Sequence, residues 1–332
     1  MRVKTPWTSS EGRASTVAPP TASPERAAEG GRPGPRASSA ARRRLGEAAW
    51  GFAFVGPQLV GLVVFVLGPL VFAIALSLMT WDGFGTREFV GLENFAQQAR
   101  DETFWVSLRN TAYFTALLLP SDLICSLLVA LAVNNVRGKV LYRLFFFMPV
   151  VTSSVAVSVV WLWLLNGEFG PVNSYLRDWF GIEPPNWIVD PAWVIPAIAL
   201  VSLWRGIGFT MVIFLAGLQG IPRTLVEAAE IDGAGALRTF WHVTLPMLSP
   251  TILFLTITSM IGSFQVFDLA YVMTNGGPGD ASRTLVFHIY DLAFVDFEFG
   301  ASAASAVVLF VILLVLTLAQ LWAQRRWVYY EE

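Results

Sequence analysis

The last long apolar stretch of the chain, Gly300–Gln324, reads GASAASAVVLFVILLVLTLAQLWAQ and contains no charged residue. An α-helix needs about 20 apolar residues to cross the hydrocarbon core of a bilayer, so this stretch is long enough to span a membrane. It ends directly before Arg325 and Arg326, whose charges are typical of the aqueous boundary of a span. A helix satisfies its own backbone hydrogen bonds, and it is therefore the structure expected for this stretch in lipid.

The composition of the whole chain agrees with a membrane protein. Its 332 residues are 55% hydrophobic and 14% charged, whereas soluble domains carry about 25% charged residues. Cys125 is the single cysteine, which excludes an internal disulfide framework. His242 and His288 are too far apart in the sequence to suggest metal ligands, and no basic block outside the N-terminal arm suits nucleic acid. We therefore expect no metal site, no cofactor bound by this chain and no nucleic-acid partner.

Five further segments are apolar over a similar or greater length, and three of them contain one charged residue each: Asp122, Arg205 and Asp268. The five segments are Ala48–Trp81, Asn110–Val136, Leu144–Gly167, Pro191–Pro222 and Val243–Gly279. Together with the last stretch, they predict an all-α, polytopic membrane protein with six transmembrane helices within residues 45–326.

Residues 1–44 differ from the rest of the chain, with many Pro, Gly, Ser, Ala and Arg residues and few large apolar ones. Such a segment buries too little apolar surface to offset its chain entropy, so it predicts a disordered N-terminal arm. A signal peptide is the alternative, but the apolar run after Arg44 is longer than a signal peptide requires. With the N-terminus inside, the cytoplasmic segments hold most of the Lys and Arg residues, including Arg42–Arg44 beside the first span. We therefore expect a multi-pass protein of the cell membrane, with a cytoplasmic arm and a cytoplasmic tail at residues 327–332.

Sequence motifs of common hydrolases and nucleotide-binding proteins are absent. The chain has no G-x-x-x-x-G-K-[ST] phosphate loop, no H-E-x-x-H pair and no G-x-S-x-G nucleophile turn. We therefore predict no catalytic residue and no enzymatic activity of the chain itself. If ATP drives its function, ATP and Mg must bind to another chain.

One predicted cytoplasmic segment, Ile221–Pro246, has a distinct local pattern and reads IPRTLVEAAEIDGAGALRTFWHVTLP. Thr224 and Glu227 have the T-x-x-E spacing of a capping box at the start of a helix. Gly233 can adopt a positive φ and end that helix. Ala236–Val243 can then form a second short helix, so the segment predicts a helix, a sharp turn and another helix.

Residues 227–246 resemble the EAA loop of permease subunits of ATP-binding-cassette importers, and we use that name for them below. The family pattern is E-A-A, three residues, G, nine residues and I-x-L-P, and the departure here is Val243 in place of isoleucine. In the family, the loop docks as a coupling helix in a groove on the ATPase. The resemblance implies ATPase-coupling roles for Glu227, Ala228, Ala229, Asp232, Gly233, Leu245 and Pro246. For Glu227 the alternative is to cap its own helix, and for Asp232 it is to terminate the helix at the turn.

Four other stretches resemble the carbohydrate-uptake branch of that family. They are Leu144–Trp163, Trp204–Phe209 (WRGIGF), Gly262–Pro278 (GSFQVFDLAYVMTNGGP) and Phe299–Leu309. By position, the resemblance implies substrate contacts at Ser154, Ser202, Trp204, Arg205, Gly206, Ser259, Ser263 and Gln265. An aromatic ring suits the apolar face of a sugar, and polar side chains suit its hydroxyl groups. For each serine, the alternative is a small residue at a helix–helix contact.

The resemblance implies a permease subunit of a bacterial-type carbohydrate importer. Its expected partners are a second permease, two cytoplasmic ATPases, an extracytoplasmic solute-binding protein and a sugar. One alternative is the same kind of importer for another solute, such as glycerol 3-phosphate. Another is an ion-driven transporter or channel that uses Asp122, Arg205 and Asp268. Asp122 departs from the usual apolar pattern of the family, and the sequence assigns it no role.

Overall fold

The computed structural model describes residues 50–134, 136–326 and 328. The predicted disordered arm, residues 1–44, lies outside the described residues, and so does the predicted tail except for Val328. Contacts divide the chain into two units, Met1–Gly61 and Leu62–Glu332. All the described elements except the start of the helix Trp50–Ser77 belong to the second unit.

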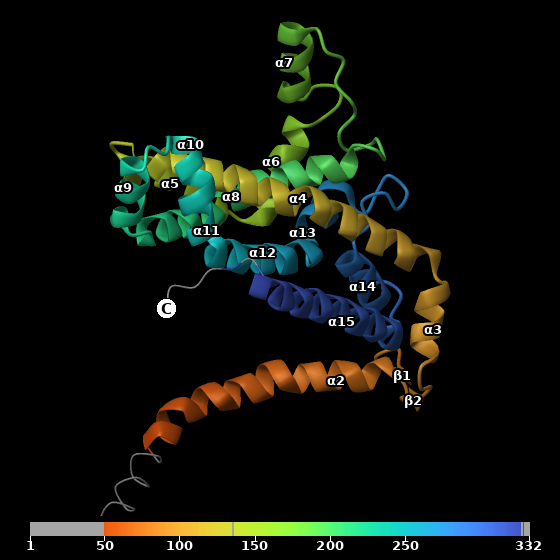
Figure 1. The fold of residues 1–332 in the computed structure, drawn as a ribbon. Helices are drawn as coiled ribbons and strands as arrows, with labels where there is room; N and C mark the ends of the chain where they lie inside the picture. Colours follow the sequence, from red (N-terminus) through yellow and green to blue (C-terminus); the bar gives the residue numbers. More distant parts are fainter. Residues whose placement is uncertain (1–49, 135, 327, 329–332) are drawn as a thin grey trace, which may run out of the picture. The chain divides into compact units, whose positions relative to one another are not determined.

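The described part of the chain is mainly helical and has almost no strands (Figure 1). Among the described residues, four helices are long and apolar enough to cross a membrane: Trp50–Ser77, α4 (Glu102–Asn134), α8 (Val194–Gly220) and α15 (Phe299–Ala323). The last part of the first helix is α2 (Gly68–Ser77). Two bent pairs also qualify as broken spans: α5 (Lys139–Val151) with α6 (Ser154–Leu164), and Ala236–Met247 with α12 (Ser249–Phe264). The prediction of an all-α, multi-pass membrane protein is confirmed. The count of six spans, which requires each bent pair to be one span, stays a prediction.

Shorter elements connect these helices. They are β1 (Met79–Thr80), β2 (Glu88–Phe89), α3 (Glu93–Arg100), α7 (Pro171–Phe180), α9 (Arg223–Ile231), α10 (Ala236–Thr239), α11 (Leu245–Met247), α13 (Asp268–Thr274) and α14 (Leu285–Phe294), with π-helical turns at Val63–Leu67 and Phe240–Thr244 and a 3₁₀ turn at Gln324–Arg326. The two strands form one antiparallel hairpin, in which Met79 faces Phe89.

The irregularities of the helices have local causes. The π-helical turn Val63–Leu67 lies directly before Gly68 and Pro69, and a proline lacks the N–H that an α-helix needs at that point. α5 ends two residues after Pro149, and its path turns by 96° before α6 begins. α4 is different, because it passes through Pro120 without a break in the helix.

The core lies where α4, α8 and α12 pack together, and α4 and α8 run side by side in Figure 1. Its largest fully buried side chains include Phe114 of α4, Phe214 of α8 and Leu255 of α12. Much apolar surface is nevertheless exposed, and the helix Trp50–Ser77 buries only 6% of its most apolar window. Such surface is expected where a helix faces lipid or another membrane chain.

Close packing of α5 on α8 depends on Gly208. A Cβ atom placed there would collide with the backbone carbonyl oxygen of Phe146. We predict that Gly208→Ala destabilises the protein by about 1–3 kcal/mol, because backbone atoms must move apart to admit the methyl group. The measurement is thermal unfolding of the purified protein in detergent. The matched control is Gly220→Ala on the same helix, where the added Cβ has open space. Equal melting temperatures for the two variants would contradict the packing described here.

Candidate functional site

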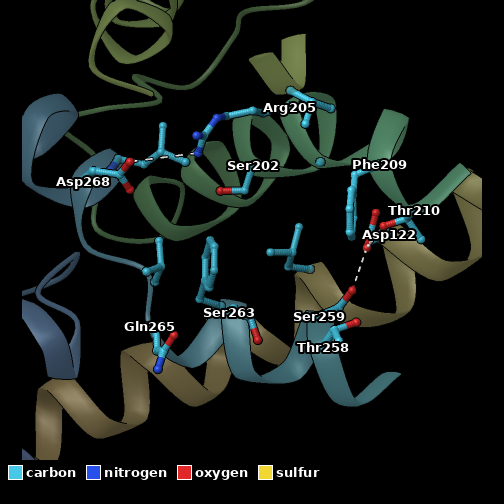
Figure 2. A pocket seen from close by; sticks show the side chains of 17 residues that line it. Asp122, Ser202, Arg205, Phe209, Thr210, Thr258, Ser259, Ser263, Gln265 and Asp268 are labelled. Carbon is cyan, nitrogen blue, oxygen red and sulfur yellow. Dashed lines mark hydrogen bonds and ion pairs between the residues drawn. The ribbon is translucent and has the colours of Figure 1, made fainter. Parts of the chain in front are cut away.

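A cavity of about 350 Å³ lies between α4, α8, α12 and the start of α13 (Figure 2). Its walls combine apolar side chains, such as Phe114, Leu118 and Phe209, with polar groups that project from the apolar helices. We call it the polar cavity. Six of the eight predicted contact residues line it, namely Ser202, Arg205, Gly206, Ser259, Ser263 and Gln265.

Helical periodicity brings the residues of α8 to the polar cavity. Arg205 and Gly206 lie three and four positions after Ser202, so these three residues share one side of the helix. Phe209 lies three positions after Gly206 and continues that side. On α12, Ser259 and Ser263 share a face for the same reason.

Gln265 reaches the polar cavity by a different route. α12 ends at Phe264, and Gln265 is the residue that terminates it. Its side chain is exposed at the point where the chain turns toward α13. An amide at this position can both donate and accept hydrogen bonds.

An ion pair lies at one side of the polar cavity. Nη1 of Arg205 is 4.0 Å from Oδ2 of Asp268, and Figure 2 shows the pair reaching from α8 to α13. Asp268 is the first residue of α13, where a negative charge also stabilises the helix dipole. Nε of Arg205 and Oγ of Ser202 are buried without a hydrogen-bond partner in the described part of the chain. Both atoms are therefore free to bind a polar group that enters the cavity.

Asp122 belongs to the same cavity, although the sequence assigned it no role. It lies within α4 with 6% of its surface exposed. Its Oδ2 accepts hydrogen bonds from Thr210 of α8 at 2.9 Å and from Ser259 of α12 at 3.0 Å, and its Oδ1 accepts one from Ser126 at 3.1 Å. The signal for Asp122 in the sequence was a carboxylate within an apolar span. The sequence did not show which residues of α8 and α12 would donate hydrogen bonds to that carboxylate.

The two remaining predicted contacts lie outside the polar cavity. Trp204 lies two positions after Ser202, which is more than half a turn of the helix, and it therefore points to a different side of α8. Its ring packs edge-on against Trp161, 5.6 Å between centroids, and lines a separate cavity of about 450 Å³ with mainly apolar walls. Ser154 is the first residue of α6, and its carbonyl oxygen accepts a hydrogen bond from Ser158. The structure thus does not bring Trp204 and Ser154 together with the other six residues.

The EAA loop has the predicted helix–turn–helix form. α9 is followed by Asp232 and by Gly233, whose φ is +80°. The N–H of Ala234 donates to the carbonyl of Ala229 at 2.9 Å, which closes the end of α9 as in a Schellman motif. A Cβ on Gly233 would meet nothing within 4 Å, so the demand for glycine comes from the backbone angle alone.

One local prediction about this segment was wrong. α9 begins at Arg223 with Pro222 as its N-cap residue, and that end has no side-chain cap hydrogen bond. Thr224 therefore lies inside the helix, and it forms no capping box with Glu227. The second short helix begins at Ala236 as predicted, as α10, and continues as the π-helical turn Phe240–Thr244.

The residues predicted to couple to an ATPase divide into exposed and partly covered ones. Glu227, Ala228, Asp232 and Gly233 are exposed, whereas Ala229, Leu245 and Pro246 are half-buried. Glu227 and Glu230 also line a cavity of about 610 Å³ with Lys139 and Arg223. Glu227 is exposed and forms no capping box with Thr224, so it is accessible from solvent.

The comparison with protein families decides what kind of protein carries this site. Residues 122–329 match the family described as "Binding-protein-dependent transport system inner membrane component". The chain belongs to this family. It is therefore an inner-membrane component of a transport system that depends on a binding protein, and its predicted role as a transport subunit, not an enzyme in itself, agrees with that membership.

Curated relatives of this inner-membrane component cover most of its length. It is 35% identical to the sn-glycerol-3-phosphate transport system permease protein UgpA of Agrobacterium fabrum, over 81% of this chain and 92% of the relative. It is 37% identical to the lactose transport system permease protein LacF of Rhizobium radiobacter, over 83% of this chain and 94% of the relative. The predicted resemblance to permeases of binding-protein-dependent importers is thus confirmed.

Solved structures support the fold. A chain in the crystal structure of a bacterial alginate ABC transporter, in complex with an alginate pentasaccharide-bound periplasmic protein, superposes with a TM-score of 0.74. The match covers 86% of this chain and 96% of that chain, at 22% sequence identity. At this identity, the likeness concerns the fold alone.

The three serines of the polar cavity differ in their availability to a solute. Ser263 is buried and donates to the carbonyl of Met260 at 2.9 Å, and Ser259 donates to Asp122. The alternative of a packing role therefore fits Ser263 best. Ser202 has a buried hydroxyl with no partner among the described residues, which fits a solute contact best.

We predict that a cysteine at position 265 reacts with a water-soluble, charged thiol reagent about tenfold faster than a cysteine at position 263, because only the first position is exposed. The measurement compares labelling rates of Gln265→Cys and Ser263→Cys in membranes. Both variants carry Cys125→Ser, which removes the native thiol. Equal rates would contradict the arrangement of these two residues at the end of α12.

Proposed function

We propose that this chain is the transmembrane permease subunit of an ATP-driven, binding-protein-dependent importer of sugars, with an oligosaccharide or a disaccharide as its solute. Its partners are a second permease, two cytoplasmic ATPases that hold ATP and Mg, and an extracytoplasmic solute-binding protein. The protein lies in the cell membrane with both termini in the cytoplasm. ATP binding closes the ATPases, and the membrane helices alternate between inward-facing and outward-facing states.

The polar cavity is the observation that carries this proposal. Its apolar walls suit the C–H faces of sugar rings, and its amide, hydroxyl and guanidinium groups suit hydroxyl groups. Ser202 and Arg205 each offer a buried donor atom without a partner in the described chain. The names of the relatives point to small polyhydroxyl solutes, lactose for LacF and sn-glycerol 3-phosphate for UgpA.

The position of the EAA loop supports ATPase coupling. α9 follows α8 after only Ile221 and Pro222, and α10 continues through α11 toward α12. The loop is thus joined at both ends to helices that line the polar cavity. Small exposed side chains at Ala228 and Gly233 permit close approach of a partner chain.

Reconstitution of the four-component transporter tests the proposed function. We expect proteoliposomes that contain both permeases and the ATPases, with the binding protein added outside, to accumulate a radiolabelled disaccharide only when ATP is inside. A catalytically inactive ATPase should abolish this uptake, because this chain contains no nucleotide-binding motif. Uptake that persists without the ATPases would instead favour an ion-driven transporter or a channel.

Substitution of Gly233 tests the coupling role of the EAA loop. We predict that Gly233→Val lowers ATP-dependent uptake at least about tenfold, because a β-branched residue at φ +80° costs roughly 1–2 kcal/mol or reshapes the turn. The matched control is Gly235→Ala, whose φ of −73° any residue adopts. Membrane insertion, measured by the amount of protein in the membrane, should be the same for both variants. Normal coupled uptake by Gly233→Val would refute the role of this turn.

A further inference from the structure

The charges around the polar cavity do not balance. Among the described residues that line it, Arg205 is the one cation, and Asp268 already accompanies it at 4.0 Å. Asp122 is a second carboxylate in the same wall, and Figure 2 shows it on the other side of the cavity from the ion pair. With all three groups ionised, the cavity has an excess of one negative charge.

Hydroxyl groups, rather than a cation, stabilise Asp122. Its hydrogen-bond donors are Ser126, Thr210 and Ser259, from three different helices. A carboxylate has about four acceptor positions, and these three bonds leave one of them unused. Neutral donors lower the energy of a buried carboxylate without cancelling its field, so a charged solute in the cavity would still experience it.

This arrangement discriminates between two kinds of polar solute. A sugar hydroxyl can donate to the remaining acceptor position of Asp122, while other hydroxyls accept from Ser202 and Arg205. A phosphate ester or a carboxylate brings acceptors and a like charge, which Asp122 repels. Arg205 compensates only in part, because Asp268 shares its charge.

We propose that Asp122 is the specificity-determining residue that makes the polar cavity select uncharged polyhydroxyl solutes and reject anionic ones. The inference rests on the proposed function, since it concerns the solute of the same importer. It implies that this chain transports an uncharged solute, such as a disaccharide, and not a phosphate ester such as the sn-glycerol 3-phosphate in the name of its relative UgpA.

The test measures solute binding by the assembled membrane complex, two permeases with their ATPases, in nanodiscs. Ligand-observed NMR gives the affinities for uncharged probes (lactose, maltose, sucrose and trehalose) and for anionic probes (sn-glycerol 3-phosphate and galacturonate). We expect the wild type to bind at least one uncharged probe about tenfold more tightly than either anion. Asp122→Asn should reduce this preference about tenfold, because the amide keeps the shape of the side chain but removes its charge. Asp122→Ser provides a second neutral variant, and it should change the preference in the same direction.

Two controls separate charge from helix positioning. Thr210→Ser changes the side chain beside Asp122 but keeps the hydroxyl that donates to its carboxylate, so the preference for uncharged probes should remain. Asp178→Asn makes the same change of charge on an exposed residue of α7 and should have no effect. The proposal is overturned by a wild type that prefers an anion, by neutral variants with unchanged preference, or by a Thr210→Ser effect as large as that of Asp122→Asn. Failure of the proposed function would show separately, as absence of ATP-dependent uptake for every probe.

Discussion

The lack of hydrogen-bond partners in hydrocarbon is the constraint on which the structure depends. Polar groups on membrane helices must find partners within the protein, so they gather where α4, α8 and α12 meet. The hydrogen bonds from Thr210 and Ser259 to Asp122 join these three helices at one point. The apolar side chains of the same helices are left to face lipid or a partner chain. The polar cavity is thus a consequence of helix packing in lipid.

The two parts of the proposed machinery share the same helices. α8 lines the polar cavity with Ser202 and Arg205 and then passes through two residues into α9 of the EAA loop. α10 and α11 lead in the other direction into α12, with a bend of 65° between Ala236–Met247 and Ser249–Phe264. On the proposed function, a force applied to the loop by an ATPase therefore acts on both walls of the cavity. The turn at Gly233, with its φ of +80°, joins α9 to α10 between these two connections.

The sequence predicted the positions of the helices better than the side-chain contacts between them. Uncharged runs located the apolar helices, and the need for a positive φ located the turn at Gly233, since both are local properties of the chain. The partners of Asp122 could not be predicted, because Thr210 and Ser259 are 88 and 137 residues away. The resemblance grouped Trp204 with the other predicted solute contacts, but a side chain two positions after Ser202 points to another side of α8. The capping box failed because the T-x-x-E spacing does not determine where a helix begins.

An electron cryo-microscopy map of the assembled transporter, trapped with an uncharged disaccharide inside, tests the solute site and the ATPase contact together. We expect ordered solute density in the polar cavity, within hydrogen-bonding distance of Gln265 and Arg205, and α9 seated against an ATPase. Solute density in the apolar cavity beside Trp204, or an EAA loop without contact to any ATPase, would contradict this expectation.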